Sequence, residues 1–132
     1  MKHFVIEEFV DRETYEVFEE KSIWFVDQKL IDVMDRLREN LGQVITVNDW
    51  KWGGNFQWRG LRTKWCDIGA DYSLHRLGRA CDFTVRNMEA EEVRKHILTN
   101  LEKYPEIKGM ELGTSWIHID VRNSEKIVLF GG

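Results

Sequence analysis

Two residues of this chain, His75 and Asp82, carry side chains that can bind a metal ion. Gly78 lies between them, and a turn at that glycine would bring a loop imidazole and a strand carboxylate together. His118, in a later segment that alternates in polarity, is placed to supply a third ligand. Such a set leaves the fourth tetrahedral position to water, as in catalytic zinc sites. The spacing alone is weak evidence, because a single histidine on a strand is more often an ordinary core or surface residue.

The residues around this pair form a fuller pattern. The positions of S-x-H-x-x-G-x-A-x-D are filled by Ser73, His75, Gly78, Ala80 and Asp82, and residues 116–122 read Trp-Ile-His-Ile-Asp-Val-Arg. This combination resembles the Hedgehog/D-Ala-D-Ala peptidase zinc family, which includes D,D-carboxypeptidases, D,D-dipeptidases and phage L-alanyl-D-glutamate endolysins. The resemblance extends over most of the chain, but it is specific only around the ligands.

The resemblance implies a function and a cofactor. It implies that His75, Asp82 and His118 bind zinc, and that Ser73 braces the site by hydrogen bonding. The expected protein is a zinc metallopeptidase that hydrolyses D-amino-acid-containing bonds in peptidoglycan stem peptides, of the endolysin or carboxypeptidase type.

The general base departs from the pattern of many relatives. An acidic residue or a histidine often stands two or three positions before the last zinc histidine, where this chain has Ser115 and Trp116. We expect Glu111 to be the base, although it can also be a simple exposed residue at a strand end. Asp120 shares a strand face with His118, which favours a role in orienting that histidine.

The substrate-binding loop also departs from the family. Many relatives have a Ser-Gly-x-Arg segment after the first strand, and its arginine holds substrate. The different loop sequence of this chain suggests a phage-type variant. We assign that catalytic role to Arg62 and substrate binding to Arg59, although the sequence does not decide between them. Trp50, Trp52 and Trp58 can form a groove wall or pack in the core.

Composition excludes some partners. The net charge is -4, and the 19 basic residues are scattered, which argues against nucleic acid because phosphate binding needs a concentrated basic face. The N-terminus lacks the apolar run of a signal peptide, and no segment has membrane-spanning length. We therefore expect synthesis in the cytoplasm and action at the cell wall after release or delivery by a partner. Cys66 and Cys81 are expected to stay reduced.

Periodicity predicts one α+β domain over residues 1–132. Helices are expected at 12–20, with Tyr15, Val17 and Phe18 inward, and at 27–40, ended by Gly42. Another helix is expected from a cap at Asn87 to residue 102. Strands are expected at 44–47, 79–85, 116–121 and 127–130, with a long binding loop at 48–77. The predicted fold is a small, mainly antiparallel sheet with flanking helices, similar to Hedgehog and D,D-peptidase domains.

Three alternatives to a peptidase remain open at this point. The chain can be a non-catalytic zinc-binding module of the same fold, which the displaced base makes credible. It can be a structural or assembly component of a phage, or an unrelated domain without a metal.

Overall fold

The computed structural model describes residues 1–64, 66 and 73–131. Residues 65 and 67–72, which belong to the predicted binding loop, and residue 132 lie outside the described part. Helices α1, α2 and α3 span Arg12–Phe18, Gln28–Leu41 and Ala90–Thr99, and strands β1 to β5 span Ile45–Thr46, Ala80–Val85, Gly109–Leu112, Ile117–Asp120 and Val128–Gly131.

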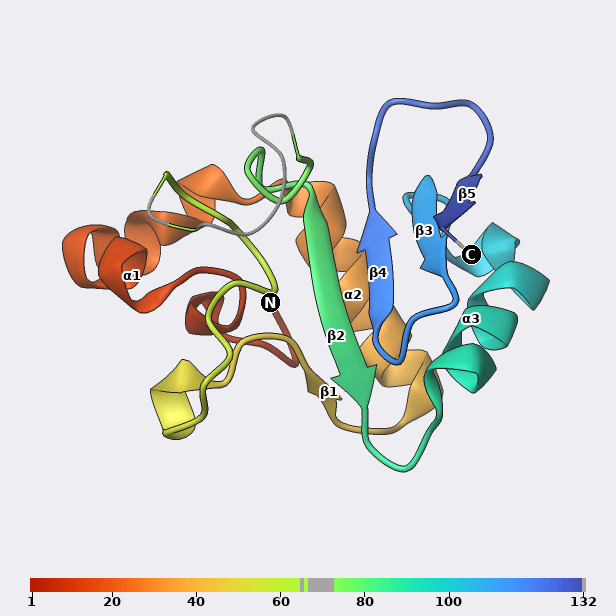
Figure 1. Ribbon diagram of the computed structural model, residues 1–132, viewed down its shortest axis with the longest axis horizontal. Coiled ribbons are helices and arrows are strands. Elements are labelled where there is room, and N and C mark those ends of the chain that lie inside the picture. Colours follow the sequence, from red (N-terminus) through yellow and green to blue (C-terminus); the bar gives the residue numbers. More distant parts are fainter. Residues whose placement is uncertain (65, 67–72, 132) are drawn as a thin grey trace.

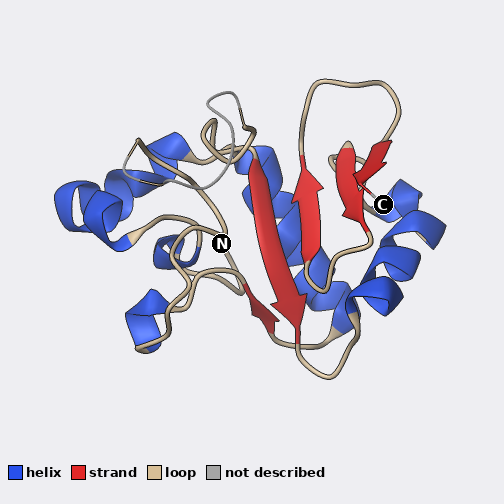
Figure 2. Cartoon of the chain, viewed as in Figure 1, coloured by secondary structure: helices blue, strands red, loops and turns tan. Residues whose placement is uncertain are grey.

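The five strands form one mixed sheet in the order β1-β2-β4-β3-β5 (Figure 2). Neighbouring strands are antiparallel except for β3 and β5, which are parallel. The prediction of an α+β chain with a mainly antiparallel sheet is therefore confirmed. In the central pair, Asp82 lies opposite His118 and Ala80 lies opposite Asp120.

The two faces of the sheet have different tasks. Successive residues of a strand point to opposite sides, so Cys81, Phe83, Ile117 and Ile119 share one face. All four are buried in the core, against which helix α2 packs from behind the sheet (Figure 1). Asp82, His118 and Asp120 point to the other face. The helices thus pack on one face of the sheet, and the candidate ligand residues lie on the other face.

Helix α2 follows its sequence prediction closely. The Asp27 side chain accepts a hydrogen bond from the backbone N–H of Lys29 and caps the helix, and Gly42 ends it in the left-handed conformation. Its inward stripe is fully apolar and comprises Leu30, Ile31, Val33, Met34 and Leu37. No helix in the described ranges is long and apolar enough to cross a membrane.

The prediction for the first helix was partly wrong. Helix α1 is capped by Asp11, ends at Phe18 and continues as a 3₁₀ helix over Glu19–Phe25. Val17 is 72% exposed and Phe18 is 40% exposed, so neither points inward. Tyr15, the third residue expected inward, is partly buried and packs against the core.

Three other local predictions need correction. Helix α3 is capped at Glu89, whose N–H donates to the Glu92 carboxylate, whereas Asn87 adopts a left-handed turn with φ 64°. The strand expected at 44–47 pairs only over Ile45–Thr46, and strand β3 was not predicted. Strand β3 contains a glycine and a glutamate, which have low strand propensity; its pairing with β4 and β5 outweighs that propensity.

The turn at Gly78 can be tested through stability. Gly78 has φ 69°, and a Cβ there would overlap the carbonyl oxygen of Phe25. Gly42 has a similar φ of 65° but open space around it. We predict that Gly42→Ala costs about 1–2 kcal/mol, the ordinary penalty of a left-handed residue, and that Gly78→Ala costs clearly more. Urea unfolding of both variants measures the difference, and equal losses would contradict the close contact.

Candidate metal centre

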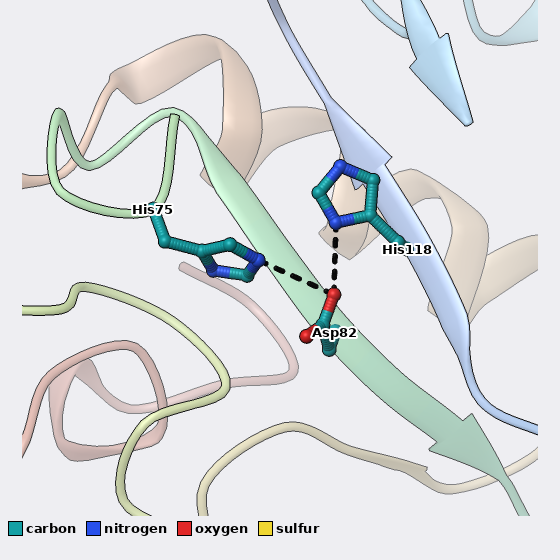
Figure 3. Close-up of side chains that lie close together, drawn as sticks. All are labelled: His75, Asp82 and His118. Carbon is teal, nitrogen blue, oxygen red and sulfur yellow. Dashed lines mark hydrogen bonds and ion pairs between the residues drawn. The ribbon is translucent and has the colours of Figure 1, made fainter. Parts of the chain in front are cut away.

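A loop and two strands bring His75, Asp82 and His118 to one point on the open face of the sheet (Figure 3). Asp82 Oδ1 lies 3.3 Å from His75 Nε2 and 2.9 Å from His118 Nδ1. One ligand atom from each residue lies within 4.8 Å of the other two, and all three residues are at most 9% exposed. The three predicted ligands are therefore together, and they can hold a metal ion.

The imidazole of His75 is fixed by the backbone. Its Nδ1 lies 3.0 Å from the carbonyl oxygen of Gly60, which can only accept, so Nδ1 carries the proton. The backbone N–H of His75 donates to Ser73 Oγ, and its carbonyl accepts from Arg62 N–H. These contacts place the Nε2 lone pair toward Asp82.

The imidazole of His118 is fixed by side chains. Its Nε2 lies 3.0 Å from Asp120 Oδ2, and Asp120 in turn accepts from Nε and Nη2 of Arg122 at 2.8 Å each. Asp120 is fully buried and lies opposite Gly109, where a Cβ would overlap its carboxylate. A carboxylate behind a ligand histidine selects the tautomer and fixes the ring. Arg122 and Gly109 were not singled out from the sequence. Gly109 meets Asp120 across the sheet, and the contact of Arg122 with Asp120 depends on how that carboxylate is oriented.

This arrangement fits a cation. With the outer nitrogens of His75 and His118 protonated toward Gly60 and Asp120, the two inner nitrogens present lone pairs to a carboxylate oxygen. Three acceptors aimed at one point repel one another unless extra protons or a cation lie between them. A single bound cation satisfies all three at once.

Electrostatics around the ligands shows the same demand for positive charge. Burial alone lowers the pKa of His118, but hydrogen bonds to Asp120 and Asp82 outweigh it and raise that pKa to about 9. Burial raises the pKa of Asp82, yet His118 and His75 together hold it well below its ordinary value. Asp120 is likewise held at a pKa of about 2, because Arg122 and His118 outweigh its burial. Both carboxylates thus stay ionised. Without a metal ion, His118 is protonated at neutral pH and donates to both of them, so a bound metal ion has to replace the proton on its Nδ1.

Arg62 is committed to this cluster. Its Nη2 donates to Asp82 Oδ2 at 3.1 Å, and its Nε donates to the carbonyl of Trp58 at 2.8 Å. The second oxygen of Asp82 is thereby fixed, which leaves Oδ1 for the ligand point. Arg62 supports the carboxylate.

A pocket of about 310 Å³ opens beside Asp82. Its lining consists of Asn55, Phe56, Gln57, Trp58, Arg59, Arg62, Asp82 and Trp116. A larger hollow of about 650 Å³, lined in part by Lys108 and Arg122, contains none of the three ligand residues. We place the site at the smaller pocket because a ligand side chain forms part of its wall.

The aromatic wall differs from the sequence prediction. Trp50 donates its indole N–H to the Val10 carbonyl and packs near Tyr15, and Trp52 is 63% exposed beside Lys51. Neither lines the pocket. Trp58 does line it, in one of the two roles expected for it, and Trp116 is the second tryptophan in the lining. Trp116 precedes His118 by two residues, and this spacing in a strand indicates that the two side chains lie on the same face of the sheet.

Arg59 is the cation that faces the pocket without a carboxylate bound to it among the described residues. Its guanidinium lies 3.6 Å from the ring centre of Phe56. Its Nη1 is buried and has no hydrogen-bond partner within the described ranges. Burial lowers the pKa of Arg59, partly offset by Asp82 and Asp49. A desolvated, incompletely bonded guanidinium favours an anionic ligand.

Glu111 lies within β3 rather than before a strand. Gly109 pairs with Asp120 and Met110 with Ile119, so the same register places Glu111 opposite His118 on the open face. It is half-buried beside Phe130 of β5, whose ring centre lies 5.4 Å from that of His118. Glu111 is not one of the three converging ligands.

The chain was compared with known proteins in three ways. No family model, no curated protein and no solved structure matches it. The functional argument therefore depends on the geometry of these residues.

Two variants distinguish the loss of a metal ligand from the loss of the Asp120 contact that orients His118. We predict that one Zn²⁺ binds per chain and that His118→Ala abolishes this binding. Gly109→Ala removes no ligand, but its methyl group displaces Asp120 from His118, so we expect affinity to fall about 10–100-fold. Isothermal titration measures both effects. Gly42→Ala is the control, because no atom lies within 4 Å of its added Cβ; unchanged affinity in Gly109→Ala would show that Asp120 does not support the site.

Proposed function

We propose that this chain is a zinc peptidase that hydrolyses D-amino-acid-containing bonds of peptidoglycan stem peptides. The observation that carries the proposal is the convergence of His75, Asp82 and His118 with both outer imidazole nitrogens already engaged. The motif resemblance adds the substrate class and a Hedgehog/D,D-peptidase-like fold, and both belong to the proposal. The α+β architecture and the mixed sheet are compatible with it.

Zinc is favoured by the donor set, and one of the two donor separations given below, that between Asp82 and His75, also fits it. Two imidazoles and one carboxylate suit zinc better than calcium or magnesium, which prefer oxygen ligands. Ligand bonds of roughly 2.1 Å in a tetrahedron place donor atoms about 3.4 Å apart. The distance from Asp82 Oδ1 to His75 Nε2 is 3.3 Å, and that to His118 Nδ1 is 2.9 Å. When bound with three protein ligands, zinc supplies a Lewis acid that lowers the pKa of a water molecule toward ~7.

We assign acid–base chemistry to Glu111. Asp120 is occupied by Arg122 and His118 and is not available for proton transfer. If the β3–β4 register is continued one residue beyond Met110, Glu111 falls on the sheet face of Asp82 and His118, and no ion pair holds its carboxylate among the described residues. In the proposed reaction it accepts the proton of the attacking water and returns it to the leaving amine.

Arg59 is the proposed substrate anchor. Arg62, which the sequence suggested for the catalytic arginine, already binds Asp82 and the Trp58 carbonyl. Arg59 instead lines the pocket, and its buried Nη1 has no hydrogen-bond partner among the described residues. We propose that it binds a substrate carboxylate or the oxyanion that forms at the scissile carbonyl. The proposed site of action is the cell wall, reached after release or through a delivering partner.

A non-catalytic zinc-binding module is the second candidate. One observation favours it: besides Asp82, the three-ligand group found among the described residues includes no second carboxylate that could act as base. Zinc binding would be the same for both candidates, so hydrolysis must decide between them.

The decisive experiment is digestion of purified peptidoglycan and of a synthetic stem pentapeptide, with mass spectrometry of the products. We predict cleavage by the Zn²⁺-loaded protein and none by His118→Ala, because the latter lacks a ligand. Product masses identify the bond that is cut. Intact substrate after prolonged incubation with fully loaded protein would refute the peptidase and leave the binding module.

The assignment of Glu111 has its own test. Glu111→Gln keeps the size of the side chain but cannot accept the proton, so we expect turnover to fall by roughly 10²-fold or more. Zinc content should not change, because Glu111 is not a ligand. Asp120→Asn is the matched variant and should act mainly on zinc affinity. A collapse of turnover with Asp120→Asn at full zinc loading, together with tolerance of Glu111→Gln, would place the base on β4 instead.

A further inference from the structure

Arg94 of helix α3 is a buried cation whose hydrogen bonds go mainly to the turn between β3 and β4. Its side chain is 3% exposed. Nη2 donates to the Thr114 carbonyl at 2.9 Å, and Nη1 donates to the Trp116 carbonyl at 3.1 Å and weakly to Thr114 Oγ1 at 3.5 Å. Nε donates to Glu91, whose own side chain is 79% exposed.

These bonds fix the path of the chain into the metal centre. The planar guanidinium holds two turn carbonyls at once, which a lysine ammonium cannot reproduce in the same geometry. Thr114 Oγ1 also donates to the Trp116 carbonyl at 2.6 Å. The backbone is therefore fixed on both sides of Ser115, three residues before His118.

The residue placed by this turn is Trp116. Period-two alternation puts its side chain on the same sheet face as His118, and it lines the pocket that also contains Asp82 and Arg59. Trp116 is 38% exposed, so the indole forms a partly open wall rather than part of the core. An indole at such a rim can stack on a peptide group while its N–H stays in contact with water.

We propose that Arg94 is a positioning residue that acts through Trp116, and that Trp116 is a substrate-selecting wall of the pocket. The substrate part of this inference rests on the proposed peptidase function. The structural part, that Arg94 sets the position of Trp116, does not. In the proposed enzyme, losing the bonds from Arg94 lets the turn shift, so that the indole no longer contacts the bound peptide.

A double-mutant cycle tests the mechanism. Trp116→Ala and Arg94→Lys should each raise KM about fivefold to tenfold, with kcat changed less and zinc content unchanged. If Arg94 acts through Trp116, Arg94→Lys should add little in the Trp116→Ala background. Glu91→Gln is the matched control, since it removes only the exposed partner of Arg94, and it should leave KM within twofold. Additive effects of the two substitutions would overturn the inference.

A second measurement does not need activity. Protein labelled with 5-fluorotryptophan gives a ¹⁹F signal for each indole, and the signal lost in Trp116→Phe assigns Trp116. We expect Arg94→Lys to shift or broaden that signal while the other indole signals remain, which also shows that the fold persists. Thr114→Val removes the weak Arg94 contact together with the hydrogen bond from Thr114 to the Trp116 carbonyl, so it should shift the same signal and tests the hydrogen bonding of the turn if Arg94→Lys does not fold.

The two measurements separate the two proposals. Failure of the wild-type protein to cleave any stem peptide refutes the peptidase, and the ¹⁹F signal then decides the role of Arg94. An unchanged Trp116 signal in Arg94→Lys refutes the positioning role, whatever the activity.

Discussion

The structure around the site holds two imidazole nitrogens close to one carboxylate oxygen, Asp82 Oδ1. Two imidazole nitrogens face it at 3.3 Å and 2.9 Å, although all three atoms carry lone pairs when the outer nitrogens hold the protons. This cluster of acceptors is costly without positive charge at its centre. The Gly60 carbonyl, the Asp120–Arg122 pair and Arg62 each keep one of these groups from turning away. Much of the open face is therefore arranged around that single point.

Residue types and strand alternation made His75, Asp82 and His118 candidate ligands, but the spacing alone was weak evidence, and the motif resemblance was needed to select them. Gly78 gives the turn, and alternation in the last segment puts His118 and Asp120 on one face. Helix α2 was equally accessible, since its apolar stripe, its cap and its terminal glycine agree. In each case several local signals indicate the same structure, which is the condition under which sequence patterns are informative.

The parts that were missed depend on contacts between distant segments. Strand β3 has little strand propensity of its own and is formed by its neighbours β4 and β5. The choice between Arg59 and Arg62 depends on which guanidinium reaches Asp82, and the wall formed by Trp116 depends on a turn fixed from helix α3. Val17 and Phe18 were misplaced because helix α1 ends at Phe18, two residues earlier than expected, and its last turn is exposed rather than packed on the core. Apart from the two-residue spacing that puts Trp116 on the face of His118, no short-range pattern contains this information.

The two histidines are held by different kinds of partner. His75 is held by a main-chain carbonyl, and substitutions at Gly60 change that carbonyl only by moving the backbone. His118 is held by the side chain of Asp120, which is held in turn by Arg122, and single substitutions at these two positions can change the strength of these hydrogen bonds. Substitutions can therefore change the surroundings of His118 more easily than those of His75. Variation in metal affinity among descendants of this chain should accumulate on the β4 side, while the loop side is inherited almost unchanged.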